Sequence, residues 1–155
     1  MLWLNYESYE SDSMAKDTFY SQVKVALIKE GWLITDDPLR LEMGGVKWEI
    51  DLGAERGTEG VLAAERDHEK IAVEVKSFIS QSPTNEMHTA LGQFITYRMA
   101  LEELQPDRKL YLAIPVSVYS GFFQLPFPQR LVKANRLALM VYDPIHQEVV
   151  KWLQD

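Results

Sequence analysis

The chain has 155 residues, 46% of them hydrophobic and 25% charged, which suits one globular domain with a sizeable core and excludes a second full domain. It contains no cysteine, which excludes disulfide frameworks, thiol catalysis and thiolate metal sites. The formal net charge of −7 argues against a protein that coats nucleic acid. Tight DNA binding would therefore depend on a partner that supplies affinity.

The sequence predicts neither a secretion signal in its first residues nor a membrane-spanning segment. No stretch approaches the roughly 20 apolar residues that cross a bilayer, and the first residues lack the basic-then-apolar order of a secretion signal. We therefore expect a cytoplasmic protein with no membrane segment. The sequence MAKD at Met14 resembles an alternative start, so we expect residues 1–13 to be a disordered leader and residues 14–155 to form a single domain.

The first predicted helix runs from the capping residue Asp17 to Glu30. Gly31 offers a left-handed stop, and residues 32–35 and 39–43 follow as predicted strands around a DDP turn. The next segment, VKWEIDLG, alternates apolar and polar residues, which is the pattern of a strand with one face in the core. This pattern places Asp51 on the polar face, and the glycine-rich residues 53–60 are predicted to form a loop.

A hairpin is predicted next, with arms at residues 61–66 and 70–78. In the second arm, alternation puts Glu74 and Lys76 on one face. A long helix should then run to about Leu104. Further strands are predicted at residues 109–114, 137–142 and 148–152, with an irregular aromatic segment near YSGFFQLPFPQR and a helical turn at 131–136.

Two carboxylates and a lysine in these strands form the one recognisable chemical cluster. Phosphodiester hydrolysis needs a divalent cation, and hard cations prefer carboxylate, carbonyl and water oxygens. Asp51 and Glu74 on neighbouring strands, with the carbonyl of Val75, would offer three oxygens from one sheet face. Lys76 could orient the attacking water or stabilise the transition state. The cluster therefore predicts a Mg²⁺ or Mn²⁺ site.

An Ile-Asp pair, then an E-V-K triplet, then a glutamine on the following helix resemble the PD-(D/E)XK nuclease superfamily. The resemblance implies a restriction-endonuclease-like α/β (α+β) fold, with a mixed central sheet flanked by helices. It also implies that Asp51 and Glu74 are metal ligands, Lys76 the catalytic cation and Gln93 a supporting polar group. Ile50 replaces the usual proline of this motif, which leaves the ligand in place but makes the motif less specific.

At a finer level, nearly the whole chain from Met14 is similar to the XisH family, the fdxN element excision controlling factors of cyanobacteria. The similarity is carried by the segments MAKDTFYSQVKVALIKEGW, VLAAERDHEKIAVEVKSF, ALGQFITYR, LYLAIP and EVVKWL, in this order. It implies a role in programmed excision of a DNA element during heterocyst differentiation. The implied partners are a companion XisI protein, a site-specific recombinase and DNA. We expect this chain to bind DNA only weakly by itself and to be part of a homo- or hetero-oligomer.

Two functional hypotheses of different classes remain open. The first is a metal-dependent DNA endonuclease or nickase that acts in excision. The second is a non-catalytic regulatory module that uses the nuclease scaffold to bind XisI, DNA or a recombinase, and the negative net charge favours it. An acyl or glycosyl hydrolase lacks a nucleophile–base motif and gives the lysine no task.

Several of these residues also have simpler interpretations. A lone carboxylate on the polar face of a strand is usually solvated, and Tyr97 on the long helix is expected to be a packing residue. The three histidines lie in separate elements without ligand spacing, so surface or turn roles are expected. The aromatic stretch from Tyr119 to Phe127 is either core beneath a loop or a segment that docks a partner, and we favour the interface.

Overall fold

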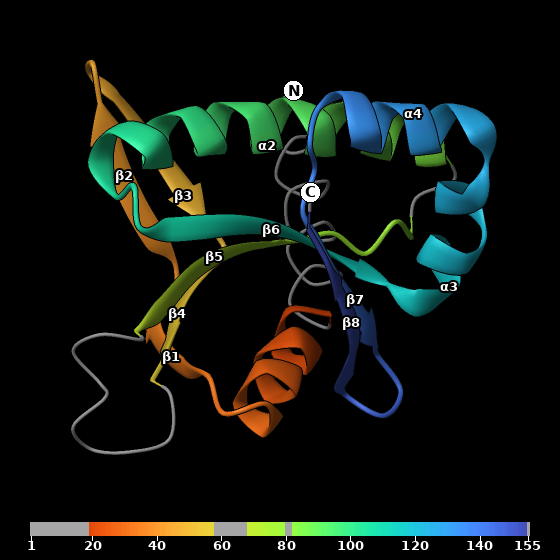
Figure 1. The fold of residues 1–155 in the computed structure, drawn as a ribbon, viewed down its shortest axis with the longest axis horizontal. Coiled ribbons are helices and arrows are strands. Elements are labelled where there is room, and N and C mark those ends of the chain that lie inside the picture. Colours follow the sequence, from red (N-terminus) through yellow and green to blue (C-terminus); the bar gives the residue numbers. More distant parts are fainter. Residues whose placement is uncertain (1–18, 58–67, 80–81, 155) are drawn as a thin grey trace, which may run out of the picture.

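The fold is built around a six-stranded mixed sheet, with a two-stranded sheet beside it (Figure 1). The structure is a computed structural model that describes residues 19–57, 68–79 and 82–154. Helices cover both faces of the larger sheet. The predicted α/β class, a mixed central sheet flanked by helices, is therefore confirmed.

The larger sheet has the strand order β1-β4-β5-β6-β7-β8. Its central strands β5, β6 and β7 are parallel, whereas the pairs β1–β4, β4–β5 and β7–β8 are antiparallel. The smaller sheet is the antiparallel hairpin of β2 and β3. The strands are β1 (Leu33–Asp36), β2 (Leu39–Met43), β3 (Val46–Ile50), β4 (Leu52–Arg56), β5 (Glu69–Val75), β6 (Arg108–Pro115), β7 (Leu139–Asp143) and β8 (Glu148–Leu153).

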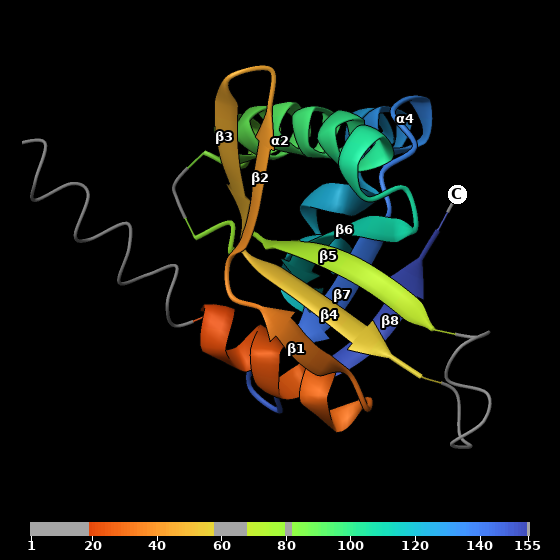
Figure 2. The ribbon, with the colours of Figure 1, turned by 90° about the vertical axis from the view of Figure 1, so that its left-hand side faces the viewer.

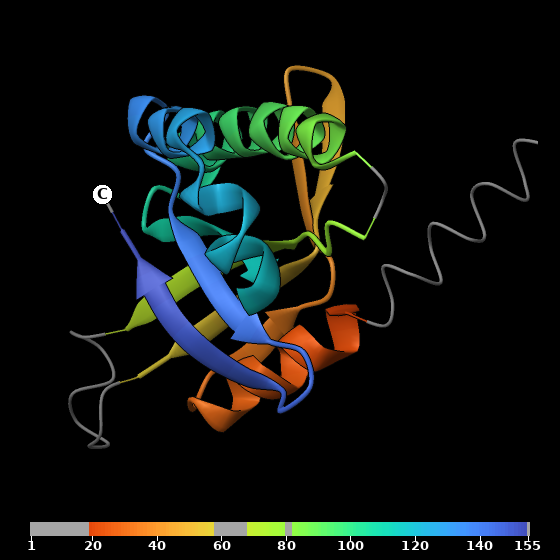
Figure 3. The same ribbon diagram turned by 90° about the vertical axis from the view of Figure 1, so that its right-hand side faces the viewer.

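A helix at residues 19–29 lies on one face of the larger sheet, and α2 (Pro83–Leu104) and α4 (Pro126–Ala134) lie on the other (Figures 1 and 3). The α2 helix begins at Pro83, because the Ser82 hydroxyl accepts a hydrogen bond from the Asn85 N–H at 3.3 Å and Pro83 occupies the first turn. In the part of the chain described here, no helix has the length and apolar character to span a membrane.

The hydrophobic core lies between the central strands and these helices. The middle strands contribute runs of fully buried residues, since parallel strands covered on both faces read as nearly continuous apolar sequence. On the 19–29 helix, the predicted apolar face is confirmed: Val23, Ala26 and Leu27 have no exposed surface, and Phe19 packs against the core.

The predicted strand VKWEIDLG is wrong in one respect, because the chain bends at Asp51 and forms two strands in different sheets. Figure 2 shows the β2–β3 hairpin rising from this corner toward α2. The loop prediction for residues 53–60 is also wrong over its first part, since residues 52–56 form β4 and pair with β5. The predicted arm at 61–66, the cap Asp17 and the leader at 1–13 lie outside the described residues.

The C-terminal half follows the prediction more closely. The helix to Leu104 and the three later strands are confirmed within one or two residues. The segment expected to be irregular is instead mostly helical, with α3 (Val116–Ser120), a 3₁₀ turn η1 (Phe122–Gln124) and α4. Pro126 begins α4 at a position where proline's fixed φ and missing N–H favour a helix start.

A Gly53→Ala substitution should destabilise the fold, because Gly53 in β4 has no room for a side chain. A Cβ there would lie 2.9 Å from Asp36 Oδ2, 3.0 Å from Asp36 Cβ and 3.1 Å from Arg108 Nη1. We expect the free energy of unfolding to fall by about 1 to 2 kcal/mol, as is typical of overpacking. Urea denaturation followed by circular dichroism would measure it, with Gly57→Ala as control because its Cβ would meet nothing within 4 Å. Equal stability of the two variants would contradict the expectation.

Candidate functional site

Asp51 lies at the corner where the two sheets meet. It stands between Ile50, the last residue of β3, and Leu52, the first of β4, and neither neighbour has exposed surface. The Tyr20 hydroxyl, from the 19–29 helix, donates a hydrogen bond to the Asp51 carbonyl at 3.1 Å. These contacts hold the corner in place and direct the aspartate toward β5.

Two hydrogen bonds join Asp51 to the end of β5, one to the Glu74 side chain and one from the Val75 backbone. The Asp51 N–H donates to Glu74 Oε1 at 3.2 Å, and the Val75 N–H donates to Asp51 Oδ2 at 2.8 Å. The strand register explains this contact, since Leu52 pairs with Val73 and the β4–β5 ladder ends there. The Asp51 carboxylate therefore satisfies a backbone donor at the point where the ladder stops.

Both carboxylates are buried, with exposed fractions of 8% for Asp51 and 2% for Glu74. The expectation of a solvent-facing polar side of the strand is wrong here. The cause is tertiary: the β2–β3 hairpin and α2 lie over this part of the sheet (Figure 2). Buried carboxylates require hydrogen bonds or cations, so this arrangement is typical of a site rather than of a solvated surface.

Val75 and Lys76, the two residues that follow Glu74, contribute the carbonyl and the lysine of the predicted site. The N–H and C=O of one strand residue point to the same side, so the Val75 carbonyl lies on the side of Asp51. The Lys76 backbone continues the pairing with β6, donating to the Ala113 carbonyl at 2.9 Å, and its own carbonyl accepts from the Tyr142 hydroxyl at 3.3 Å. The Lys76 side chain is half-buried and has no ion pair among the described residues.

The α2 helix carries Tyr97, which the sequence predicts to be a packing residue. Tyr97 is buried, and burial first, then the charges of Glu74 and Asp51, raise its pKa. Gln93 lies one turn earlier, and its Oε1 atom is buried without a hydrogen-bond partner in the described part of the chain. The four-residue spacing of Gln93 and Tyr97 on one helix face was the available signal for this pair.

A second polar pair lies near the corner and was not predicted. Lys24 Nζ from the 19–29 helix is 2.6 Å from Asp37 Oδ2. Burial, and then the charge of Asp51, raise the pKa of Asp37. The ion pair with Lys24 acts in the opposite direction.

The donor set fits a hard divalent cation. It consists of two buried carboxylates and the Val75 carbonyl at the end of the β4–β5 ladder. Among the described residues, no group of three or more His, Asp or Glu side chains is suited to a metal. Magnesium commonly binds through one or two carboxylates and keeps several waters, so this set suits it. The buried Oε1 of Gln93, one turn before Tyr97 on α2, is an acceptor that a water would satisfy.

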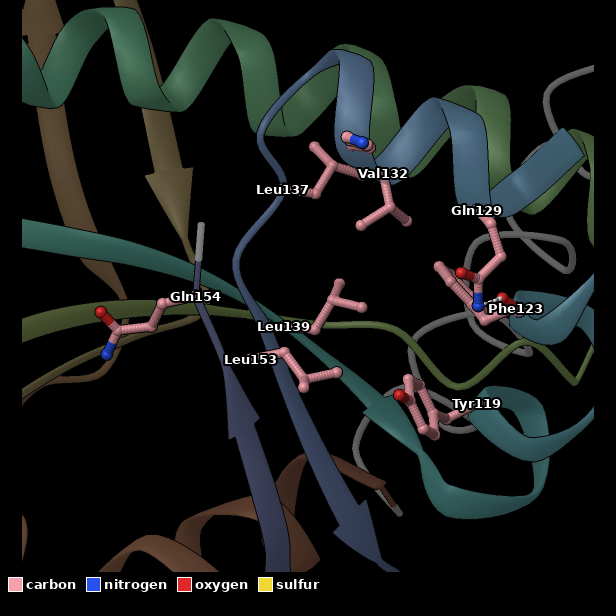
Figure 4. Close-up of a pocket in the computed structure, with 9 residues that line it drawn as sticks. Tyr119, Phe123, Gln129, Val132, Leu137, Leu139, Leu153 and Gln154 are labelled. Atoms are coloured by element: carbon pink, nitrogen blue, oxygen red, sulfur yellow. Dashed lines mark hydrogen bonds between the residues drawn. The ribbon is translucent and has the colours of Figure 1, made fainter. Parts of the chain in front are cut away.

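The remaining sequence candidates lie elsewhere. His68, His88 and His146 are exposed, and His68 and His146 contact Glu55 at 2.9 Å and Asp143 at 2.7 Å, in keeping with surface roles. The aromatic stretch divides: Phe123 is 2% exposed and belongs to the core, whereas Phe127 is 65% exposed. Figure 4 shows Phe123 and Tyr119 at a largely apolar cavity of about 250 Å³ beside β7 and β8.

Comparison with known proteins gives consistent matches. The sequence model described as XisH protein matches residues 13–150. A solved XisH family protein from Nostoc punctiforme PCC 73102 is 46% identical, with a TM-score of 0.79, and the match covers 88% of this chain and 99% of that one. A solved fdxN element excision controlling factor protein from Anabaena variabilis is 47% identical, also with a TM-score of 0.79, covering 89% and 99% of the two chains. No curated protein sequence matches the chain.

Proposed function

The chain belongs to the XisH family, and from that premise we propose that it is a metal-dependent DNA endonuclease-type protein that acts in excision of a DNA element. The Anabaena variabilis relative bears the name of an fdxN element excision controlling factor, which supports the excision role. The observation that carries the enzymatic part is the buried contact between Asp51 and Glu74, followed in sequence by Lys76.

In this proposal, the site follows the PD-(D/E)XK arrangement of a restriction-endonuclease-like fold. Asp51, Glu74 and the Val75 carbonyl would hold Mg²⁺ or Mn²⁺, which supplies charge stabilisation and a more acidic bound water when present. Lys76, beside the ligands, orients the attacking water or stabilises negative charge on the phosphate. Gln93 supports the site through its buried amide oxygen.

The proposed partners follow from the family and from the charge. At a net charge of −7 the chain would bind DNA weakly by itself. We propose that an XisI-like companion supplies the affinity, together with a recombinase, and that the protein acts within a homo- or hetero-oligomer. Action on chromosomal DNA would place the protein in the cytoplasm.

A second function is favoured by the same net charge. A non-catalytic module could use the scaffold to bind XisI, DNA or a recombinase, with Asp51 and Glu74 acting structurally through their hydrogen bonds. In that case the carboxylates hold the corner between the two sheets and need no cation.

Isothermal titration of Mg²⁺ and Mn²⁺ into the wild type and a Glu74→Gln variant separates the two functions. The amide keeps an acceptor for the Asp51 N–H, so the fold should survive while the charge is lost. We expect wild-type protein to bind the metal and nick supercoiled plasmid, and the variant to lose both.

The matched control is Glu69→Gln, which removes an exposed carboxylate from the same strand, where it pairs with Arg56 at 3.2 Å. This control should bind metal and nick like the wild type. Absence of metal binding in the wild type would reject the enzymatic function and leave the scaffold role.

A further inference from the structure

The positive charge of this acidic protein is concentrated in one region. Between positions 108 and 142 the sequence has five lysines and arginines and no aspartate or glutamate. Arg130, Lys133 and Arg136 recur every three residues along α4 and just past its end, and all three are exposed. The helices α4 and α2 lie on the same face of the sheet (Figures 1 and 3).

A cavity of about 210 Å³ lies where this region meets α2 and the start of β6. Its charged lining consists of Arg98, Arg108, Lys109, Arg136 and a single acidic residue, Glu102. Because cations outnumber anions four to one around a single concave surface, the cavity has the electrostatics of an anion site.

Three of these cations have only neutral partners. Arg98 Nη1 donates to the backbone carbonyls of Asn135 at 2.7 Å and Arg136 at 3.1 Å, and Lys109 Nζ donates to the Gln154 amide at 2.6 Å. Within the described residues, no carboxylate pairs with Arg98, Lys109 or Arg136. Arg108 differs, since it lies 3.8 Å from both Asp36 and Glu55, so it contributes little net charge.

Arg136 occupies a backbone position that favours glycine. Its φ is +50°, and its N–H donates to the Lys133 carbonyl at 3.2 Å in the turn that ends α4. Glycine adopts this left-handed conformation without strain, whereas an arginine does not. An exposed cation therefore stands where the fold alone would prefer no side chain, which is typical of a functional position.

We propose that this cavity, which lies at the opposite end of β5 and β6 from the carboxylate pair, binds phosphate groups of the DNA backbone. The proposal deepens the proposed function, since it assigns the surface that holds DNA. Guanidinium and ammonium groups held on α2, on β6 and in the turn after α4 suit phosphate oxygens. DNA is favoured over an acidic protein segment because the cavity is lined by Arg98 of α2, the same helix that carries Gln93 and Tyr97 of the candidate site.

Fluorescence anisotropy with a labelled DNA duplex in EDTA tests the proposal without cleavage. The test variant combines Arg136→Gly, which removes the charge and relieves the strain, with Lys109→Ala. We expect its affinity at about 50 mM salt to fall roughly tenfold, and the slope of log affinity against log salt to decrease by about two, as for two lost phosphate contacts. In urea denaturation, the single variant Arg136→Gly should have a free energy of unfolding at least as large as that of the wild type.

Lys29→Ala is the matched control, because it removes an exposed lysine from the helix on the opposite face of the sheet. It should bind the duplex nearly as well as the wild type. Equal losses in control and test variants, or no duplex binding by the wild type, would overturn the proposal. Wild-type binding of a polyglutamate peptide or of inorganic phosphate in place of DNA would overturn it too. DNA binding in EDTA, together with no nicking when Mg²⁺ is supplied in a separate assay, would reject catalysis while supporting this surface.

Discussion

A Lys76→Ala variant should nick supercoiled plasmid about 100- to 1,000-fold more slowly than the wild type while still binding Mg²⁺. Removal of one preorganised group that stabilises charge in the transition state typically has an effect of this size. Lys76 is not a metal ligand, and its backbone hydrogen bonds to Ala113 and Tyr142 do not depend on its side chain. Metal titration and circular dichroism should therefore match the wild type, and a time course of nicking measures the rate.

Lys70→Ala provides the control for this prediction. Lys70 is on the same strand, five residues before the end of β5, and its ammonium lies 3.9 Å from Glu55 in an exposed pair. Exposed pairs of this kind contribute little, so nicking should be unchanged. Full activity of Lys76→Ala would show that the lysine has no role in the chemistry, even if metal binding is confirmed.

Much of the fold is predictable from local pattern, and the errors have one physical origin. The first helix, which stops before Gly31, and the long helix to Leu104 are predicted from local features, and both are confirmed. The break at Asp51 is not local, because the alternation of VKWEIDLG continues without interruption through the corner. Only the pairing of β3 with β2 and of β4 with β5 divides the segment between two sheets.

The candidate site shows the same division. The sequence indicates that Asp51 and Glu74 lie on neighbouring strands, and the structure brings them into hydrogen-bonding contact. Their burial could not be read from strand alternation, because it depends on the hairpin and α2 that cover them. Tyr97 is a core packing residue, as expected, and its burial together with the charges of Glu74 and Asp51 raises its pKa, an effect that depends on the packing of α2 against the sheet.

Arg108 lies at the end of the sheet opposite to Asp51 and Glu74. There it forms a buried network that should contribute strongly to stability. Its side chain is 6% exposed. Its Nε donates to Gln105 Oε1 at 2.7 Å, and its Nη1 donates to the Ile71 carbonyl at 2.9 Å. Its Nη2 lies 3.8 Å from the carboxylates of Asp36 and Glu55, which are on β1 and β4. One guanidinium therefore links four strands of the sheet.

Arg108→Ala should lower the free energy of unfolding by about 3 kcal/mol, measured by urea denaturation. Removal of one partner from a buried ion pair typically costs 3 to 5 kcal/mol, and the lower end applies because Asp36 and Glu55 are partly exposed. Arg40→Ala is the control: its pair with Glu49 at 3.4 Å is exposed, so the loss should stay below about 1 kcal/mol. Equal losses in the two variants would contradict a stabilising role for the buried network.

The deficit of Arg108→Ala should also depend on pH, through Glu55. The pKa of Glu55 is lowered, chiefly by its hydrogen bond from His68 and further by Lys70 and Arg108, against the opposing effect of burial. A carboxylate with a lowered pKa stabilises the fold above its unfolded-state pKa, and this contribution is lost as the pH falls through the lowered value. The difference between wild type and variant should therefore be largest near neutral pH and shrink in acid. A deficit that stays constant down to full protonation of Glu55 would instead assign the effect to the neutral hydrogen bonds with Gln105 and Ile71.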